Sequence, residues 1–415
     1  MTAITTTLNC FKNLHCDCKI KDTVPKELCD GQISTKWLLN IMIKADCQVK
    51  KLCHKCKIEK ITFTRLGVGS AFNSTIYRVK ISFEGSPVFS LIVKIPCCSI
   101  TAEGGLVMPK TTFMGHNKEV EFYNIFKDVE LNTIPKCYFG RKTGEKEQAI
   151  LLIEDLGAEV ITPSMYQPCR REQVFKVAEE LARFQAKVSK LPKNSWSHFE
   201  DYFHTLEVHT VLNPVCTPAN VEYDSNLKPL LDELQPVSNE KFARYACLER
   251  PGELGAITLC HGDVWNGNMF FYRDATKEIG ISNNLRAFVD FQTVFGGNMF
   301  LDIARYVVLC ARGEVRRSVH NEIVGHFLRC LKKAFKEEGV EYKYNFDEKE
   351  AQELYDLCVV QQAIVNIMII PYFSPNADGA PEETHKIRMA ELHQRMKEMF
   401  IDAAEIMRKY GWDKL

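Results

Sequence analysis

The sequence predicts an α+β chain in which a small β-rich lobe, residues 58–157, precedes a large α-helical lobe, residues 158–415. Strand-like runs of β-branched and aromatic residues fill the first region, and apolar residues at spacings of three and four dominate the second. Gly157, a helix-averse residue after the acidic Glu154 and Asp155, marks the expected hinge. Residues 1–57 are rich in Cys and Lys and are interpreted as an N-terminal extension.

The β-rich lobe is expected to begin with a three-stranded antiparallel meander. Its strands are predicted over 60–66, 76–83 and 88–95, and Gly85 and Pro87 supply the turn between the last two. Apolar residues at helical spacing predict a helix over 117–128, and the short apolar run 149–153 predicts a further strand that ends at Glu154.

The α-helical lobe is expected to contain long helices, and a short helix is expected in the N-terminal extension at 37–43. The first long helix carries buried-type residues three and four apart and is closed by Pro192. The predicted ranges of the long helices are 170–191, 301–336, 348–370 and 381–410.

Composition restricts the class of partner. The 415 residues include 53 Lys and Arg against 53 Asp and Glu, so no global basic field favours nucleic acid. The longest apolar run, 363–370, is far shorter than the ~20 residues that a membrane helix needs. With no secretory signal near the start, the 17 scattered cysteines indicate a reduced, cytoplasmic protein. No pattern predicts an oligomeric state.

The most informative stretch is 259–271, where His261, Gly262 and Asp263 precede Asn268 between apolar flanks. A second carboxylate, Asp290, ends an apolar strand-like run further along. Phosphoryl transfer needs this set of groups: one carboxylate accepts the proton of the attacking hydroxyl, while a carboxamide and another carboxylate hold Mg²⁺. We therefore expect Asp263 to be the catalytic base and Asn268 and Asp290 to be the metal ligands.

Each of these parts has a plainer interpretation when taken alone. Gly and Asp are common turn residues, so the triplet at 261–263 fits an ordinary loop. Asp290 alone fits a helix N-cap or a turn. The combination of Asp263, Asn268 and Asp290 at these spacings is what favours the chemical interpretation.

Lys94 stands inside an otherwise apolar strand, where an unpaired ammonium is costly to bury. Glu119, on the next predicted helix, can pair with it so that the lysine contacts the α- and β-phosphates of a nucleotide, as in kinase-type sites. The alternative is an edge-strand lysine whose ammonium extends to water.

Two further segments are assigned to nucleotide binding. The loop between the first two strands contains Gly67, Gly69 and Ser70, whose backbone N–H groups can face phosphates, although a third glycine is missing and a plain hairpin loop fits equally. Glu154, at the end of the 149–153 strand, is also assigned to the nucleotide site.

The order of these parts resembles the ecdysteroid kinase-like (CHK kinase-like) family of the aminoglycoside phosphotransferase and choline kinase superfamily. The matching segments are 92–96, 119–123, 152–156, 259–268 and 290–292, with Asp302 after them. The resemblance implies a bilobal protein-kinase-like fold and the use of ATP and Mg²⁺. It also implies phosphorylation of a hydroxyl on a small molecule, such as a steroid, glycoside, amino alcohol or xenobiotic. The family often has a His near the end of the helix that leads into the large lobe, whereas residues 181–186 of this chain contain none.

Three other interpretations are weighed against this one. A protein kinase is disfavoured, because Gly262 replaces the Arg of His-Arg-Asp and no Ala-Pro-Glu follows Asp290. A catalytically inactive kinase-fold protein that binds a nucleotide or ligand is disfavoured by the intact Lys94, Asp263 and Asp290. Cys53-His54-Lys55-Cys56 could hold zinc, but a second ligand pair of suitable spacing is missing, so free thiols are expected.

Overall fold

A computed structural model describes residues 18–67, 74–97, 99–100, 106–107, 110–130, 132–144, 147–199, 217–277, 279–376 and 378–415. The chain divides into two compact units. The first comprises Met1–Lys127 and Pro135–Gly157, and the second comprises Asp128–Ile134 and Ala158–Leu415. The short segment Asp128–Ile134, which the sequence analysis assigned to the β-rich lobe, thus groups with the second unit. Its Thr133 carbonyl accepts a hydrogen bond from Phe288 N at 2.8 Å.

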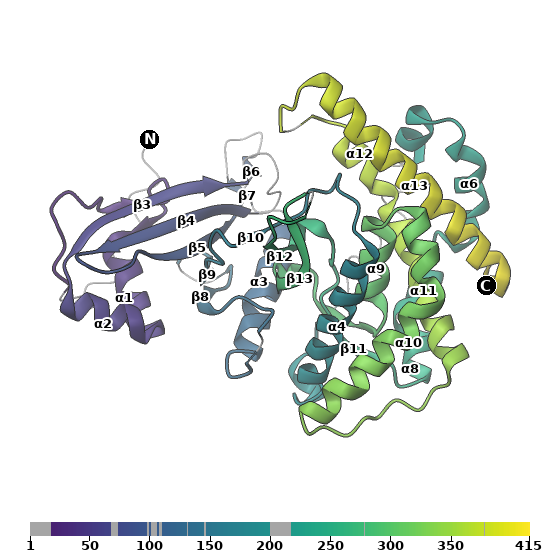
Figure 1. Cartoon of the computed structure of the whole chain (residues 1–415), viewed down its shortest axis with the longest axis horizontal. Coiled ribbons are helices and arrows are strands. Elements are labelled where there is room, and N and C mark those ends of the chain that lie inside the picture. Colours follow the sequence, from purple (N-terminus) through teal and green to yellow (C-terminus); the bar gives the residue numbers. More distant parts are fainter. Residues whose placement is uncertain are drawn as a thin grey trace. The chain divides into compact units, whose positions relative to one another are not determined.

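The first unit is built on a five-stranded antiparallel sheet with the order β3-β4-β5-β9-β8 (Figure 1). The expected meander is present, with a turn at Gly85 (φ +64°) between its last two strands. Helix α3 lies between the third and fourth strands in chain order and buries Val120, Phe122 and Tyr123, as their spacing predicted; Phe126, directly after the helix, is buried as well. The sheet strands and this helix are β3 (Ile58–Leu66), β4 (Ser74–Phe83), β5 (Phe89–Pro96), α3 (Lys110–Ile125), β8 (Cys137–Arg141) and β9 (Ile150–Glu154).

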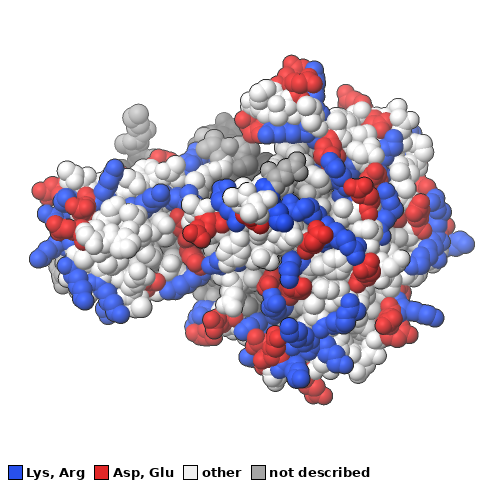
Figure 2. Space-filling view, in the orientation of Figure 1, with Lys and Arg blue, Asp and Glu red and all other residues white. Residues whose placement is uncertain are grey.

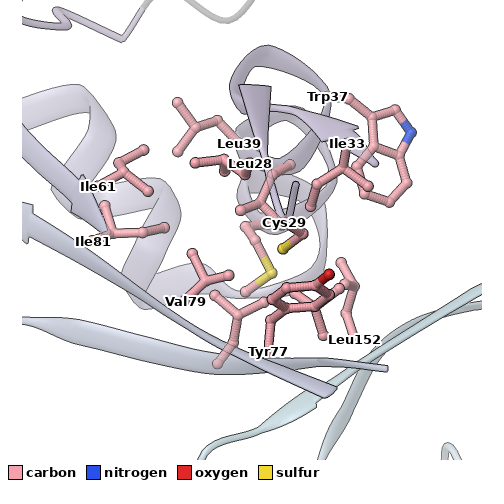
Figure 3. Packing of buried hydrophobic residues seen from close by; sticks show 14 of the residues in the cluster. Leu28, Cys29, Ile33, Trp37, Leu39, Ile61, Tyr77, Val79, Ile81 and Leu152 are labelled. Atoms are coloured by element: carbon pink, nitrogen blue, oxygen red, sulfur yellow. The ribbon is translucent and has the colours of Figure 1, made fainter. Parts of the chain in front are cut away.

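The segment interpreted as an N-terminal extension is part of this unit. It forms two helices rather than one, because Ser34 and Asp46 each supply an N-cap whose side chain accepts backbone N–H bonds. Its apolar residues pack against those of the sheet, and Figure 3 shows Leu28 and Leu39 beside Ile61 and Ile81. The remaining elements are β1 (Glu27–Leu28), β2 (Ile33–Ser34), α1 (Thr35–Ala45), α2 (Cys47–Lys55), β6 (Ser99–Ile100) and β7 (Leu106–Val107).

The second unit is mostly helical, as predicted, and it contains two small antiparallel sheets, β10-β12-β13 and β11-β14. The helical pattern over 301–336 forms two helices, α9 and α10, that are separated at 311–312. The helices are α4 (Arg171–Val188), α6 (Leu227–Glu233), α7 (Glu240–Arg244), α8 (Arg250–Glu253), α9 (Leu301–Cys310), α10 (Gly313–Glu337), α11 (Glu348–Val365), α12 (Ile369–Phe373) and α13 (Glu382–Tyr410). The strands are β10 (Val160–Ile161), β11 (Ile257–Cys260), β12 (Met269–Arg273), β13 (Ile281–Phe288) and β14 (Phe295–Asn298).

One helical stretch in the described residues, Glu348–Phe373, has the length and apolar character of a membrane span, with a mean hydropathy of 1.5. It is longer than the apolar run considered in the sequence because α11 continues through a short 3₁₀ turn into α12. However, 89% of the most apolar 18-residue window of this stretch is buried inside the fold, where α11 packs against α9 and α13. This burial is typical of a core helix.

Charged side chains of both signs are interspersed over the face shown in Figure 2. This distribution agrees with the formal net charge of zero.

Candidate functional site

The β12–β13 hairpin brings Asn268 and Asp290 to the same end of one sheet. Met269, the first residue of β12, pairs with Phe288, the last residue of β13. Just beyond this pair, Val289 N donates to the Asn268 carbonyl oxygen at 2.9 Å. The two residues predicted to bind a metal therefore lie at neighbouring positions in the fold.

The loop that carries Asp263 follows β11 and is held by a buried carboxylate. Asp302, which is 1% exposed, accepts hydrogen bonds from His261 N and Gly262 N, both at 2.8 Å. The His261 ring makes two polar contacts, with Nε2 3.0 Å from the Val289 carbonyl oxygen and Nδ1 accepting from Asp263 N at 3.2 Å. Burial raises the pKa of Asp302, an effect opposed by His261, these two backbone donors and Arg305.

Gly262 is required by the geometry of this loop. Its φ is +81°, a left-handed conformation that favours glycine, and a Cβ atom there would lie 2.4 Å from the Thr293 carbonyl oxygen. An arginine at this position, as in the His-Arg-Asp motif of protein kinases, would not fit unless the backbone moved. The glycine in the His-Gly-Asp motif is thus explained by packing.

The Asp263 carboxylate is fixed by contacts to both of its oxygens. Oδ1 accepts from Arg305 Nε at 2.9 Å and from Arg305 Nη2 at 2.6 Å. Oδ2 accepts from Asn268 Nδ2 at 2.9 Å and from Trp265 Nε1 at 3.3 Å. The residues predicted as base and metal ligand are therefore in direct contact, and the carboxylate has one orientation.

Sequence reasoning missed Arg305. It lies on α9, one turn after Asp302, is 5% exposed, and also donates to Gln362 Oε1 at 2.8 Å. The sequence did contain a signal. Arg305 is a charged residue inside the apolar run 303–309 and, like Lys94, it requires a partner of opposite charge when it is buried.

The donor set at the hairpin end fits a hard divalent cation. The amide nitrogen of Asn268 donates to Asp263, which leaves the amide oxygen Oδ1 as the atom suited to a metal. Asp290 has a φ of +69°, an unusual backbone for a residue other than glycine, and its Oδ2 accepts from Gln292 Nε2 at 3.1 Å. Carboxylate and amide oxygens are the ligands that Mg²⁺ prefers.

In the first unit, Lys94 and Glu119 form the expected buried ion pair. The distance from Lys94 Nζ to Glu119 Oε2 is 2.6 Å, and the residues are 8% and 1% exposed. Lys94 lies on β5, which has β4 on one side and β9 on the other, so the edge-strand alternative is wrong. Burial lowers the pKa of the nearby His116, so this imidazole adds no positive charge beside the pair at neutral pH.

The other residues assigned to nucleotide binding remain predictions. Gly67 follows β3 with a φ of +62°, whereas Gly69 and Ser70 lie outside the described residues. Glu154 ends β9, and its Oε2 accepts from Lys136 N at 3.1 Å. Gln185, in the stretch 181–186 where the family often has a histidine, is buried and donates to the Met299 carbonyl oxygen at 2.7 Å.

We expect Asp302→Ala to destabilise the second unit, because two buried backbone N–H groups lose their acceptor at a cost of about 1–3 kcal/mol each. Urea unfolding followed by tryptophan fluorescence measures this loss. Asp274→Ala, in the exposed turn after β12, is the matched control and should shift the midpoint much less. Equal midpoints for Asp302→Ala and the unmodified chain would show that Asp302 does not hold the 261–263 loop.

Five antiparallel strands, a helix between the third and the fourth, and a strand lysine paired with a glutamate of that helix define a protein-kinase-like α+β fold. The chain belongs to the DUF1679 family, described as "Uncharacterized oxidoreductase dhs-27", whose profile matches residues 100–409. The observed fold agrees with the protein-kinase-like fold that the motifs indicated.

Two curated relatives come from Caenorhabditis elegans. "Uncharacterized kinase-like protein D1044.1" is 25% identical over 223 residues, which is 52% of this chain and 57% of that protein. "Uncharacterized oxidoreductase dhs-27" is 26% identical over 311 residues, which is 70% of this chain and 37% of that protein. The chain thus spans little more than half of the first relative and about a third of the second.

Similar solved structures include a putative aminoglycoside phosphotransferase from Ralstonia eutropha. It is 11% identical, with 83% of this chain and 92% of that chain covered and a TM-score of 0.43. A spectinomycin phosphotransferase in complex with ADP and spectinomycin is 10% identical, with 86% and 98% covered and a TM-score of 0.42.

Proposed function

We propose that this protein is an ATP- and Mg²⁺-dependent phosphotransferase that phosphorylates a hydroxyl group of a small molecule. The observation that carries the proposal is the arrangement in the second unit, where an oriented Asp263 carboxylate contacts Asn268 and Asn268 adjoins Asp290 through the hairpin. A steroid, a glycoside, an amino alcohol and a xenobiotic all remain acceptors of the proposed class.

Each unit contributes a part to this proposal. In the first unit, the Lys94 ammonium supplies a positive charge for nucleotide phosphates, and Glu119 fixes its position. Gly67, Gly69, Ser70 and Glu154 are assigned to the same nucleotide. In the second unit, Asn268 and Asp290 would hold Mg²⁺, which neutralises phosphate charge when bound.

Asp263 would orient the acceptor hydroxyl and accept its proton as that oxygen attacks the terminal phosphorus of ATP, the bond from this phosphorus to the bridging oxygen breaks and ADP leaves. Arg305 and Asn268 keep the carboxylate in one orientation, and Asp302 keeps the loop beneath it in place. These contacts provide the preorganisation that positioning catalysis requires.

A second candidate is a catalytically inactive nucleotide- or ligand-binding protein of the same fold. It is favoured by one observation: both oxygens of Asp263 already accept hydrogen bonds from neighbouring side chains. Nucleotide binding alone does not separate the two candidates, whereas product formation does.

An oxidoreductase is not proposed, although one relative carries that name. Dinucleotide-binding folds are built on a parallel sheet. In the described residues, all paired strands of the named sheets are antiparallel, and the parallel pairing is a single bridge between Ile20 and Ile58.

A double-mutant cycle on Lys94 and Glu119 tests the nucleotide-binding part. Lys94→Met removes charged hydrogen bonds worth about 1.5–3 kcal/mol, so the affinity for ATP measured by calorimetry should fall roughly 10- to 150-fold. Glu119→Gln should weaken binding less, and the double variant should be less than additive because both changes affect one interaction.

Lys80→Met, an exposed lysine on the neighbouring strand β4, is the matched control and should bind ATP normally. Circular dichroism on every variant excludes unfolding as the cause. Fully additive losses, or normal ATP affinity in Lys94→Met, would contradict a joint role for the pair.

A further inference from the structure

Helices α4 and α10 of the second unit pack side by side (Figure 1) and bring together three side chains of metal-ligand type. His326 and Cys330 lie four residues apart on one face of α10, and Glu179 projects from α4. Their ligand atoms all lie within 4.8 Å of one another. His326 Nε2 is 3.4 Å from Cys330 Sγ and 3.7 Å from Glu179 Oε1. The kinase-type site uses none of these residues.

The surroundings orient two of the three ligands. Lys176 Nζ binds the other carboxylate oxygen of Glu179, Oε2, at 2.9 Å, so Oε1 is the oxygen on the His326 side. The His326 ring contacts the Phe175 ring edge to face, with centroids 4.8 Å apart, and this contact restricts the orientation of the imidazole.

We propose that Glu179, His326 and Cys330 form a binding site for a zinc-type divalent cation, with water in the fourth position. One oxygen, one imidazole nitrogen and one sulfur are ligands that Zn²⁺ accepts in tetrahedral sites. A thiol and an imidazole do not suit Mg²⁺ or Ca²⁺, which prefer oxygen ligands. The ion would link α4 to α10.

Cobalt(II) is the probe that tests this site, because thiolate ligation gives it an intense near-ultraviolet charge-transfer absorption. We expect the reduced, metal-free full-length protein to bind Co²⁺ with this absorption and Cys330→Ser to lose it. Zinc competition should show an affinity at least about tenfold weaker in Cys330→Ser and in His326→Gln. Glu179→Gln, which keeps an acceptor for Lys176, should weaken binding without removing the thiolate absorption.

Cys56→Ser is the matched control, since Cys53-His54-Lys55-Cys56 is the other zinc candidate in the sequence. It should leave the cobalt spectrum and the zinc affinity unchanged. The proposal would be overturned if the unmodified protein shows no thiolate absorption with Co²⁺. It would equally be overturned if Cys330→Ser keeps the spectrum, or if Cys56→Ser alone removes it.

Thermal unfolding gives a second measurement. Because a ligand that binds only the folded protein raises its stability, Zn²⁺ should raise the melting temperature of the unmodified protein and of Cys56→Ser. At the same zinc concentration it should raise that of a folded Cys330→Ser protein by a clearly smaller amount, because the weakened site binds less zinc. An equal zinc-dependent rise in Cys330→Ser would contradict the site.

Discussion

Replacing Asp263 with Asn is expected to lower turnover by about 10²- to 10⁴-fold, the usual effect of losing a general base. Asparagine keeps the shape of the side chain and can still accept hydrogen bonds from Arg305, but it cannot accept the proton of the acceptor hydroxyl. The affinity for ATP, measured by calorimetry, should remain nearly unchanged. Because the proposed role concerns the acceptor, the loss should lie in kcat.

The same substitution leaves Arg305 without its anionic partner, and breaking a buried ion pair typically costs about 3–5 kcal/mol. Activity must therefore be measured below the unfolding temperature of the variant. Asp274→Asn, in the exposed turn after β12, is the matched control and should keep full turnover. A folded Asp263→Asn protein with normal turnover would place the base elsewhere.

Replacing Asp290 with Asn is expected to remove the Mg²⁺-dependent part of ATP binding. Asparagine tolerates the left-handed backbone at this position, where φ is +69°, so the change removes charge without the strain that alanine would add. Loss of a carboxylate ligand should weaken Mg·ATP binding at least about tenfold.

Calorimetry with and without Mg²⁺ measures this effect, and the unmodified protein without Mg²⁺ is the reference. The variant should bind ATP equally in both conditions. Retention of the full magnesium-dependent gain in affinity would refute Asp290 as a metal ligand.

Local patterns were sufficient to predict the elements that position the Lys94–Glu119 part of the candidate site. The three meander strands, α3 and the strand before Glu154 follow from β-propensity, turn residues and helical spacing, all of which act over a few residues. The buried Lys94–Glu119 pair was also predictable, because a charge inside an apolar strand requires a partner.

Other features depend on contacts between distant segments. The sequence pattern predicted one helix over 301–336 and did not show the break before α10. Helix α10 begins at Gly313, whose N–H donates to Glu398 Oε2 on α13 at 2.7 Å, so a carboxylate distant in the sequence helps to set where this helix starts. The N-terminal helices are stabilised by apolar residues that meet the sheet only in the folded unit. Arg305 was missed as the partner of Asp263 because 42 residues separate them.

The central claim is that the protein transfers the terminal phosphoryl group of ATP to a small-molecule hydroxyl. The most direct test incubates it with γ-labelled ATP, Mg²⁺ and an extract of hydroxylated metabolites, and then identifies labelled products by mass spectrometry. Our account predicts a labelled phosphate monoester that is absent without Mg²⁺ and absent with Asp263→Asn. A nucleotide-binding protein that forms no labelled product from any class of acceptor, or forms the same product with Asp263→Asn, would contradict it.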